Sequence, residues 1–156
     1  MPYQNIDAQL SEAEVQAVKA AFDTIREKLP FLVNLTPAER RSLFKAGPDS
    51  LSFVQNSLQA AQNNPGVLPG NFDEQGFGRD VALCAALTDV GTQAAQLAAQ
   101  IEDTRLAVGS ESMRQATEAY TYFKTAAKTT PGLRPVVEQL AERFKKSKAK
   151  PAGPTG

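Results

Sequence analysis

Apolar residues recur at helical spacing along most of the chain, and this pattern predicts an all-α fold. Ser11 and Glu14 form a capping box at the start of the first amphipathic segment, which runs to about residue 29. Its apolar face consists of Val15, Val18, Phe22, Ile25 and Leu29. A second capping box, Thr36 with Glu39, opens a short helix that extends to about residue 45.

The most regular apolar pattern lies in residues 73–108 and predicts one long helix. Its seam consists of Leu83, Leu87, Val90, Ala94, Leu97, Ile101 and Val108. The alternating spacings of four and three are those of left-handed helix bundles. We expect Gly109-Ser110 to end this helix and to begin another, which runs to about residue 128 and folds back as an antiparallel hairpin.

Two further helices complete the prediction, one over residues 49–62 and one that follows Thr130-Pro131-Gly132 and carries Leu140 and Phe144. The predicted fold is an antiparallel four-helix-type bundle with one long central helix and short accessory helices. We assign residues 1–10 to an N-terminal arm, residues 11–148 to a single helical-bundle domain, and residues 149–156 to a disordered tail.

Net charge, hydrophobicity and cysteine content indicate which binding partners and which compartment to expect. The 17 basic and 17 acidic side chains cancel, so there is no strong signal for nucleic-acid binding. No apolar stretch reaches the roughly 20 residues of a membrane span. The single cysteine, Cys84, precludes an intramolecular disulfide, and the first ten residues do not resemble a signal peptide. We therefore predict a cytoplasmic protein, with Cys84 as a small buried residue.

The chain contains no histidine, which bears on catalysis. This excludes Ser-His-Asp and Cys-His nucleophile pairs, His-ligated zinc and haem held by a proximal histidine. No catalytic set and no cofactor is predicted, and the sequence favours a protein without enzymatic activity. A carboxylate or magnesium enzyme around Glu102 and Asp103 is a third, weaker hypothesis.

The charged side chains Glu102, Asp103 and Arg105 lie where the long helix is expected to end. They could hold a cation, or Arg105 could clamp an anionic ligand against the N-terminus of the next helix. The alternative, which we favour, is a set of solvated charges. A basic run, Arg143, Lys145, Lys146, Lys148 and Lys150, allows contact with an anion, but we favour a solubilising helix end.

Apolar and aromatic residues give the other candidate contacts. Val67, Leu68 and Phe72 lie in a loop rich in glycine and proline, where they either bind a ligand or close one end of the bundle. Tyr120 and Phe123 either line a pocket between helices or fill the core. For both sets packing is the favoured interpretation.

Two stretches, Leu29-Pro30-Phe31-Leu32-Val33-Asn34-Leu35-Thr36-Pro37-Ala38-Glu39-Arg40-Arg41 and Ile101-Glu102-Asp103-Thr104-Arg105-Leu106-Ala107-Val108-Gly109-Ser110-Glu111, resemble segments of an uncharacterised bacterial family of small all-helical proteins. The resemblance covers most of the chain from the first helix onward. It implies a bacterial origin and a helical fold, and it carries no activity.

Two hypotheses about function rank above the carboxylate or magnesium enzyme. The first is a non-enzymatic protein–protein interaction or assembly module, whose long alanine-lined helix accepts a partner helix or a second copy in a homo-oligomer. The second is a small-ligand-binding bundle, with an apolar cavity between helices near Phe123 and the loop of Val67, Leu68 and Phe72.

Overall fold

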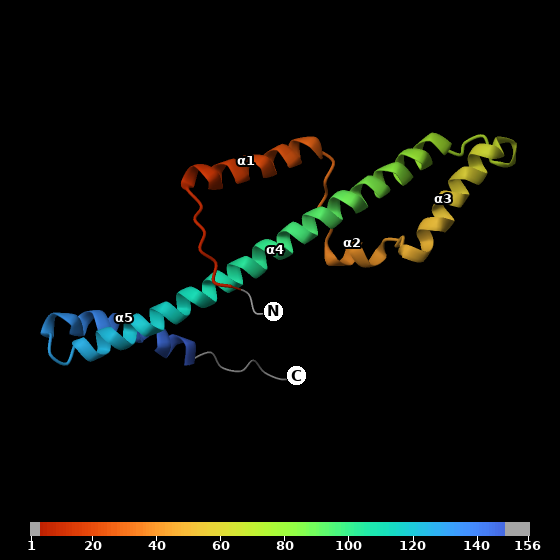
Figure 1. Ribbon diagram of the computed structural model, residues 1–156. Helices are drawn as coiled ribbons and strands as arrows, with labels where there is room; N and C mark the ends of the chain where they lie inside the picture. The colour runs from red at the N-terminus through yellow and green to blue at the C-terminus, as the bar shows by residue number, and fades with distance from the viewer. Residues whose placement is uncertain (1–3, 149–156) are drawn as a thin grey trace, which may run out of the picture. The chain divides into compact units, whose positions relative to one another are not determined.

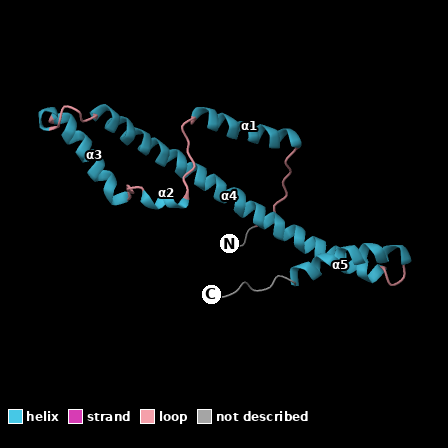
Figure 2. Cartoon of the chain, turned by 180° about the vertical axis from the view of Figure 1, so that it is seen from behind, coloured by secondary structure: helices cyan, strands magenta, loops and turns pink. Residues whose placement is uncertain are grey.

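The computed structural model describes residues 4–148, with side chains described through residue 145. These residues form five α-helices and two short 3₁₀ helices, and no strand occurs among them (Figures 1 and 2). The elements are α1 (Glu12–Lys28), α2 (Pro37–Ser42), α3 (Pro48–Asn63), η1 (Pro65–Val67), α4 (Glu74–Ala126), η2 (Pro131–Leu133) and α5 (Arg134–Lys148). The predicted all-α class is confirmed. The whole of the predicted tail, residues 149–156, and the first three residues of the predicted arm lie outside the described part.

Both predicted capping boxes are formed. The Ser11 hydroxyl oxygen accepts a hydrogen bond from the Glu14 backbone N–H at 3.2 Å, while the Glu14 carboxylate accepts one from the Ser11 N–H at 2.7 Å. Thr36 and Glu39 repeat this exchange at 3.2 and 2.8 Å. The carboxylates accept these bonds in their ionised form, which lowers the pKa of both Glu14 and Glu39.

The predicted helix end at Gly109-Ser110 is wrong, because α4 continues through both residues to Ala126. No glycine among the described residues has a positive φ angle, so Gly109 does not adopt the left-handed conformation of a helix cap. A glycine inside a helix costs only about 1 kcal/mol relative to alanine. Leu106 and Ala107, which precede Gly109, favour the helical conformation. The helix α4 then ends at Ala126, shortly before Pro131.

The chain divides into two compact units. Among the described residues, one unit comprises residues 8–97, with α1, α2, α3 and the first part of α4; the other comprises residues 4–7 and 98–148, with the rest of α4 and α5. In the first unit, the loop through η1 returns the chain from α3 to the start of α4 (Figure 1). In the second unit, α5 runs back alongside the C-terminal end of α4 (Figures 1 and 2).

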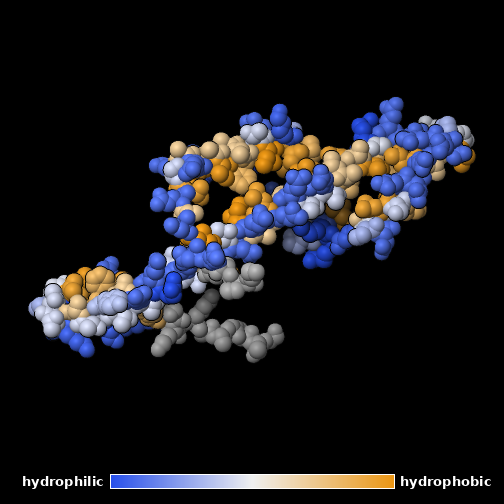
Figure 3. All heavy atoms as spheres, in the orientation of Figure 1, coloured by the Kyte–Doolittle hydropathy of each residue, from blue (hydrophilic) through white to orange (hydrophobic). Residues whose placement is uncertain are grey.

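The apolar faces of the helices remain largely uncovered. Among residues with described side chains only Ala61 is buried, with 7% of its surface exposed. The seam residues Leu83, Val90, Leu97, Ile101 and Val108 are 39–50% exposed, so the buried seam predicted from the sequence is absent within one chain. Figure 3 shows hydrophobic residues in the open on helices of both units. The seam lacks the neighbour that a hairpin at Gly109 would have supplied.

Membrane-spanning character is not found in the described helices. None of them, including the 53-residue α4, contains a stretch apolar enough to cross a bilayer. The regularly spaced polar residues of α4 account for this.

Candidate functional site

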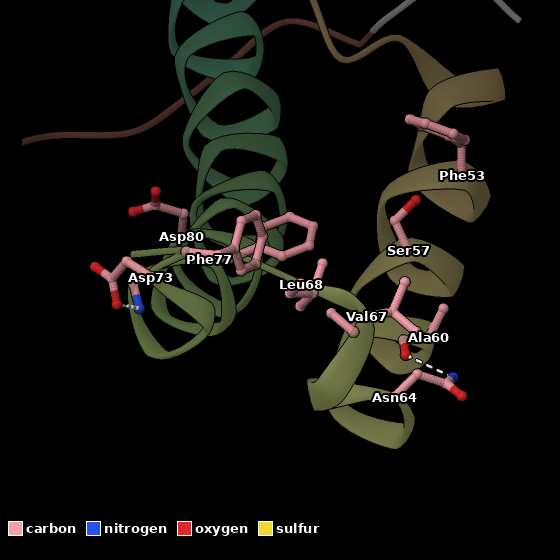
Figure 4. A pocket seen from close by; sticks show the side chains of 12 residues that line it. Phe53, Ser57, Ala60, Asn64, Val67, Leu68, Asp73, Phe77 and Asp80 are labelled. Carbon is pink, nitrogen blue, oxygen red and sulfur yellow. Dashed lines mark hydrogen bonds between the residues drawn. The ribbon is translucent and has the colours of Figure 1, made fainter. Parts of the chain in front are cut away.

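The first candidate site is a groove between α3, the η1 loop and the first turns of α4. It has a volume of about 830 Å³ and is lined mainly by apolar side chains. Val67, Leu68 and Phe72, the loop residues predicted as ligand or partner contacts, all line it. Figure 4 shows Leu68 and Phe77 between the two helices, with Val67 beside α3. The loop therefore forms one wall of the groove.

Local interactions explain how the groove is built. The Asp73 carboxylate caps α4 by accepting a hydrogen bond from the Gly76 N–H at 2.8 Å (Figure 4). This cap starts the helix so that the Phe77 ring meets Phe72 edge-to-face, with ring centroids 6.2 Å apart. At the end of α3 the Asn64 side-chain amide donates to the Ala60 carbonyl at 2.9 Å. Both ends of the loop are thereby held.

The rim of the groove carries negative charge. Asp73 and Asp80 both line it, and Arg79 lies 3.8 Å from the Asp73 carboxylate through an exposed ion pair. Such an exposed pair contributes little to stability. The groove combines an apolar floor with two carboxylates, a combination suited to an apolar group that carries a positive charge.

A second groove lies between the end of α4 and α5, with a volume of about 530 Å³. Tyr120 forms part of its lining, and its ring contacts Phe144 of α5 at a centroid distance of 5.3 Å. Phe123 is 40% exposed and is not among the lining residues. Each of these helix pairs therefore has a groove of its own.

The apolar face of α4 changes direction between residues 97 and 123. Leu97, Ile101 and Val108 mark the first face. Met113, Tyr120 and Phe123 mark the second. With 3.6 residues per turn, the mean direction of the second face is rotated by about 110° from that of the first. The change of direction occurs around Gly109, where the sequence predicts a break between two helices.

The predicted charged corner forms an ion pair within α4. Arg105 donates to both Glu102 carboxylate oxygens, at 2.9 and 2.6 Å, and this bond and charge lower the pKa of Glu102 and raise that of Arg105. No helix begins at Ser110, so the free N–H groups required for an anion clamp are missing there. Asp103 is exposed, and the described residues hold no cluster of three metal-ligating side chains.

Cys84 and the basic run complete the predicted candidates. Cys84 is exposed, contrary to the expectation of a buried thiol, and the pocket beside it is lined by residues of α4 alone. Arg143 lines the second groove, and Lys145 is exposed. The side chains of Lys146 and Lys148, and the whole of Lys150, lie outside the described part.

Sequence reasoning missed three contributors. Phe77 and Asp80 line the first groove, and the signal in the sequence was an aromatic residue one turn after Asp73, a residue type that caps helices. Glu111 accepts a hydrogen bond from the Ile6 N–H at 3.2 Å and so holds the N-terminal segment against α4. No local pattern links residues 105 positions apart in the chain, and this contact was not predictable.

Comparison of the chain with family models, curated proteins and solved structures finds no match.

Proposed function

We propose that this chain is a non-enzymatic assembly module that associates with further helices through the apolar faces of α4. The observation that carries the proposal is the exposure of a regular seam. Leu97 and Ile101, in the middle of the 53-residue helix, leave about half of their surface in water. A repeat of four and three has the spacing with which helices pack against one another.

Exposed apolar area on this scale favours association. Burial contributes about 25 cal/mol for each Å² of apolar surface removed from water. A single exposed leucine is ordinary, but a continuous row of apolar side chains marks an interaction surface. The equal numbers of acidic and basic residues leave no net repulsion between copies of the chain. Two or more copies would then supply the helices of the bundle that the sequence predicts.

The assembly is tested by placing a charge in the seam. We expect Leu97→Asp and Ile101→Asp to convert an oligomer into a monomer, because a buried unpaired carboxylate opposes association. Thr92→Asp is the matched control, since it places the same group on the opposite side of α4. Size-exclusion chromatography with light scattering gives the mass of each variant. A wild-type chain that is monomeric at 100 micromolar would contradict the proposal.

A second candidate function is binding of a small apolar molecule in the first groove. Its volume of about 830 Å³ lies within the range of ligand sites, and Asp73 and Asp80 at the rim favour a cationic head group. We use dodecyltrimethylammonium, below its micellar concentration, as the probe.

Ligand binding is measured by thermal shift, because a bound ligand stabilises the folded state. We expect the probe to raise the melting temperature and Leu68→Asp to abolish the rise. Leu106→Asp, on an exposed part of α4 remote in sequence from the groove, is the control. An equal response in both variants, or no shift with the wild-type chain, would rule out this function.

A further inference from the structure

We propose that the partner of α4 is a second copy of this chain, and that the two copies exchange their C-terminal helices. In this arrangement α3 and residues 74–108 of α4 from one copy pack against residues 110–126 of α4 and α5 from the other. Each resulting bundle therefore contains four helical segments. The inference rests on the proposed assembly function and names its partner.

The first argument is that the chain continues as a helix through Gly109, where the sequence predicts a turn. The sequence carries two apolar faces that meet there, as expected for two helices joined by a turn. The structure instead joins them in one helix without a cap or a positive φ angle. Domain swapping has this signature: a connection that would fold back in a closed monomer is extended, and an identical copy supplies the missing element.

The second argument is that each helix pair has an open apolar surface and that the charges beside the two surfaces are opposite. The α3–α4 pair and the α4–α5 pair each have an open apolar groove, of about 830 and 530 Å³. Four-helix bundles form when two such layers stack. Carboxylates border the first groove, while Arg143 lines the second, so the charges of the two layers are also complementary.

The third argument is the exposure of apolar side chains within each unit. Leu83 and Val90 in the first unit, and Met113 and Val136 in the second, leave 39–48% of their surface exposed. Burial of such side chains against a second copy removes apolar surface from water and stabilises the dimer.

Distances between spin labels test the exchange. Labels are placed at Gln96→Cys and Thr121→Cys in a Cys84→Ser background, on polar positions of α4. In a continuous helix these sites are about 38 Å apart within one chain. In a hairpin closed at Gly109 they lie within about 20 Å, because packed helices are about 8–10 Å apart. Doubly labelled chains diluted with unlabelled chains give this intrachain distance.

Mixed dimers, with one label on each chain, give the distance between copies. The proposal predicts an intrachain distance of about 38 Å together with an interchain distance, from position 96 to position 121, within about 20 Å. A short intrachain distance in an oligomer overturns the exchange but leaves the assembly function standing. A long interchain distance in an oligomer also overturns the exchange and leaves the assembly function standing. A monomer overturns both.

Glycine substitutions give an independent test that needs no labels. Ala at Gly109 or at Gly91 meets no atom within 4 Å, so both Gly109→Ala and Gly91→Ala should favour the continuous helix. We expect each to raise the melting temperature by about 2–4 °C. If Gly109 instead caps a helix in a closed hairpin, Gly109→Ala lowers the melting temperature while Gly91→Ala still raises it. That result would overturn the exchange.

Discussion

At the scale of single residues, the helix starts are controlled by side chains that lie three positions apart. Ser11 with Glu14 and Thr36 with Glu39 form the same pair of reciprocal bonds, although α1 has 17 residues and α2 only six. The bonds satisfy N–H groups that have no partner within the helix. A helix as short as α2 is unstable by itself in water, so its cap contributes a large share of its stability.

Removal of one cap should change the titration of its own glutamate only. The Ser11 N–H and hydroxyl hold the pKa of Glu14 below its ordinary value, so this bond stabilises the fold above the unfolded pKa of about 4.3 and is lost as the pH falls through the folded pKa. We expect Ser11→Ala to raise the titration midpoint of Glu14, measured by NMR.

The two capping boxes serve as controls for each other. Thr36→Ala should leave the Glu14 midpoint unchanged and raise that of Glu39, because the backbone and hydroxyl of residue 36 lower the pKa of Glu39. An unchanged Glu14 midpoint in Ser11→Ala would show that the side chain of Ser11 does not hold the carboxylate.

At the scale of elements, helix ends follow from the sequence where a local signal decides them. The ends of α1 and α3 lie within about one residue of their predicted positions, because caps, Pro48 and the Asn64-Pro65 pair act on adjacent backbone groups. Gly109 gives no such signal, because a glycine raises the free energy of a helix only slightly. Whether the helix ends at Gly109 or continues depends on which other helices pack against this segment.

The candidate sites follow the same distinction. That Val67, Leu68 and Phe72 line a groove was predictable, because a loop between two helices places its apolar residues at their junction. The exposure of the seam and of Cys84 was not predictable, because burial depends on which helices meet and not on the order of residues within one helix.

The contact between α4 and α5 should depend on one aromatic pair. We expect Tyr120→Ala to lower the free energy of unfolding by about 1–2 kcal/mol, because it removes the packing of Tyr120 on Phe144. Tyr122 lies two residues on and is 69% exposed, so Tyr122→Ala should stay within about 0.5 kcal/mol of the wild type. The free energies of unfolding of the two variants are measured by urea unfolding, followed by circular dichroism. An equal loss of stability in both variants would contradict the predicted role of the aromatic pair.

At the scale of the whole molecule, Ala61 is the only buried residue among those with described side chains, so the proposed dimer should couple folding to association. Stability then depends on protein concentration, because unfolding of this dimer releases two chains. A tenfold rise in concentration contributes about 1.4 kcal/mol per dimer, which corresponds to about 2 °C in melting temperature for two chains of this length.

We therefore expect the melting temperature to rise by about 4 °C between 1 and 100 micromolar, as measured by scanning fluorimetry or circular dichroism. The dissociated variant Ile101→Asp should show no such dependence, since its unfolding involves one chain. Salt should reduce the wild-type shift only slightly, because it screens the attraction between the carboxylates of the first groove and Arg143, while the rest of the proposed interface is apolar. A wild-type melting temperature independent of concentration would mean that each chain folds alone, with its apolar faces closed by its own helices.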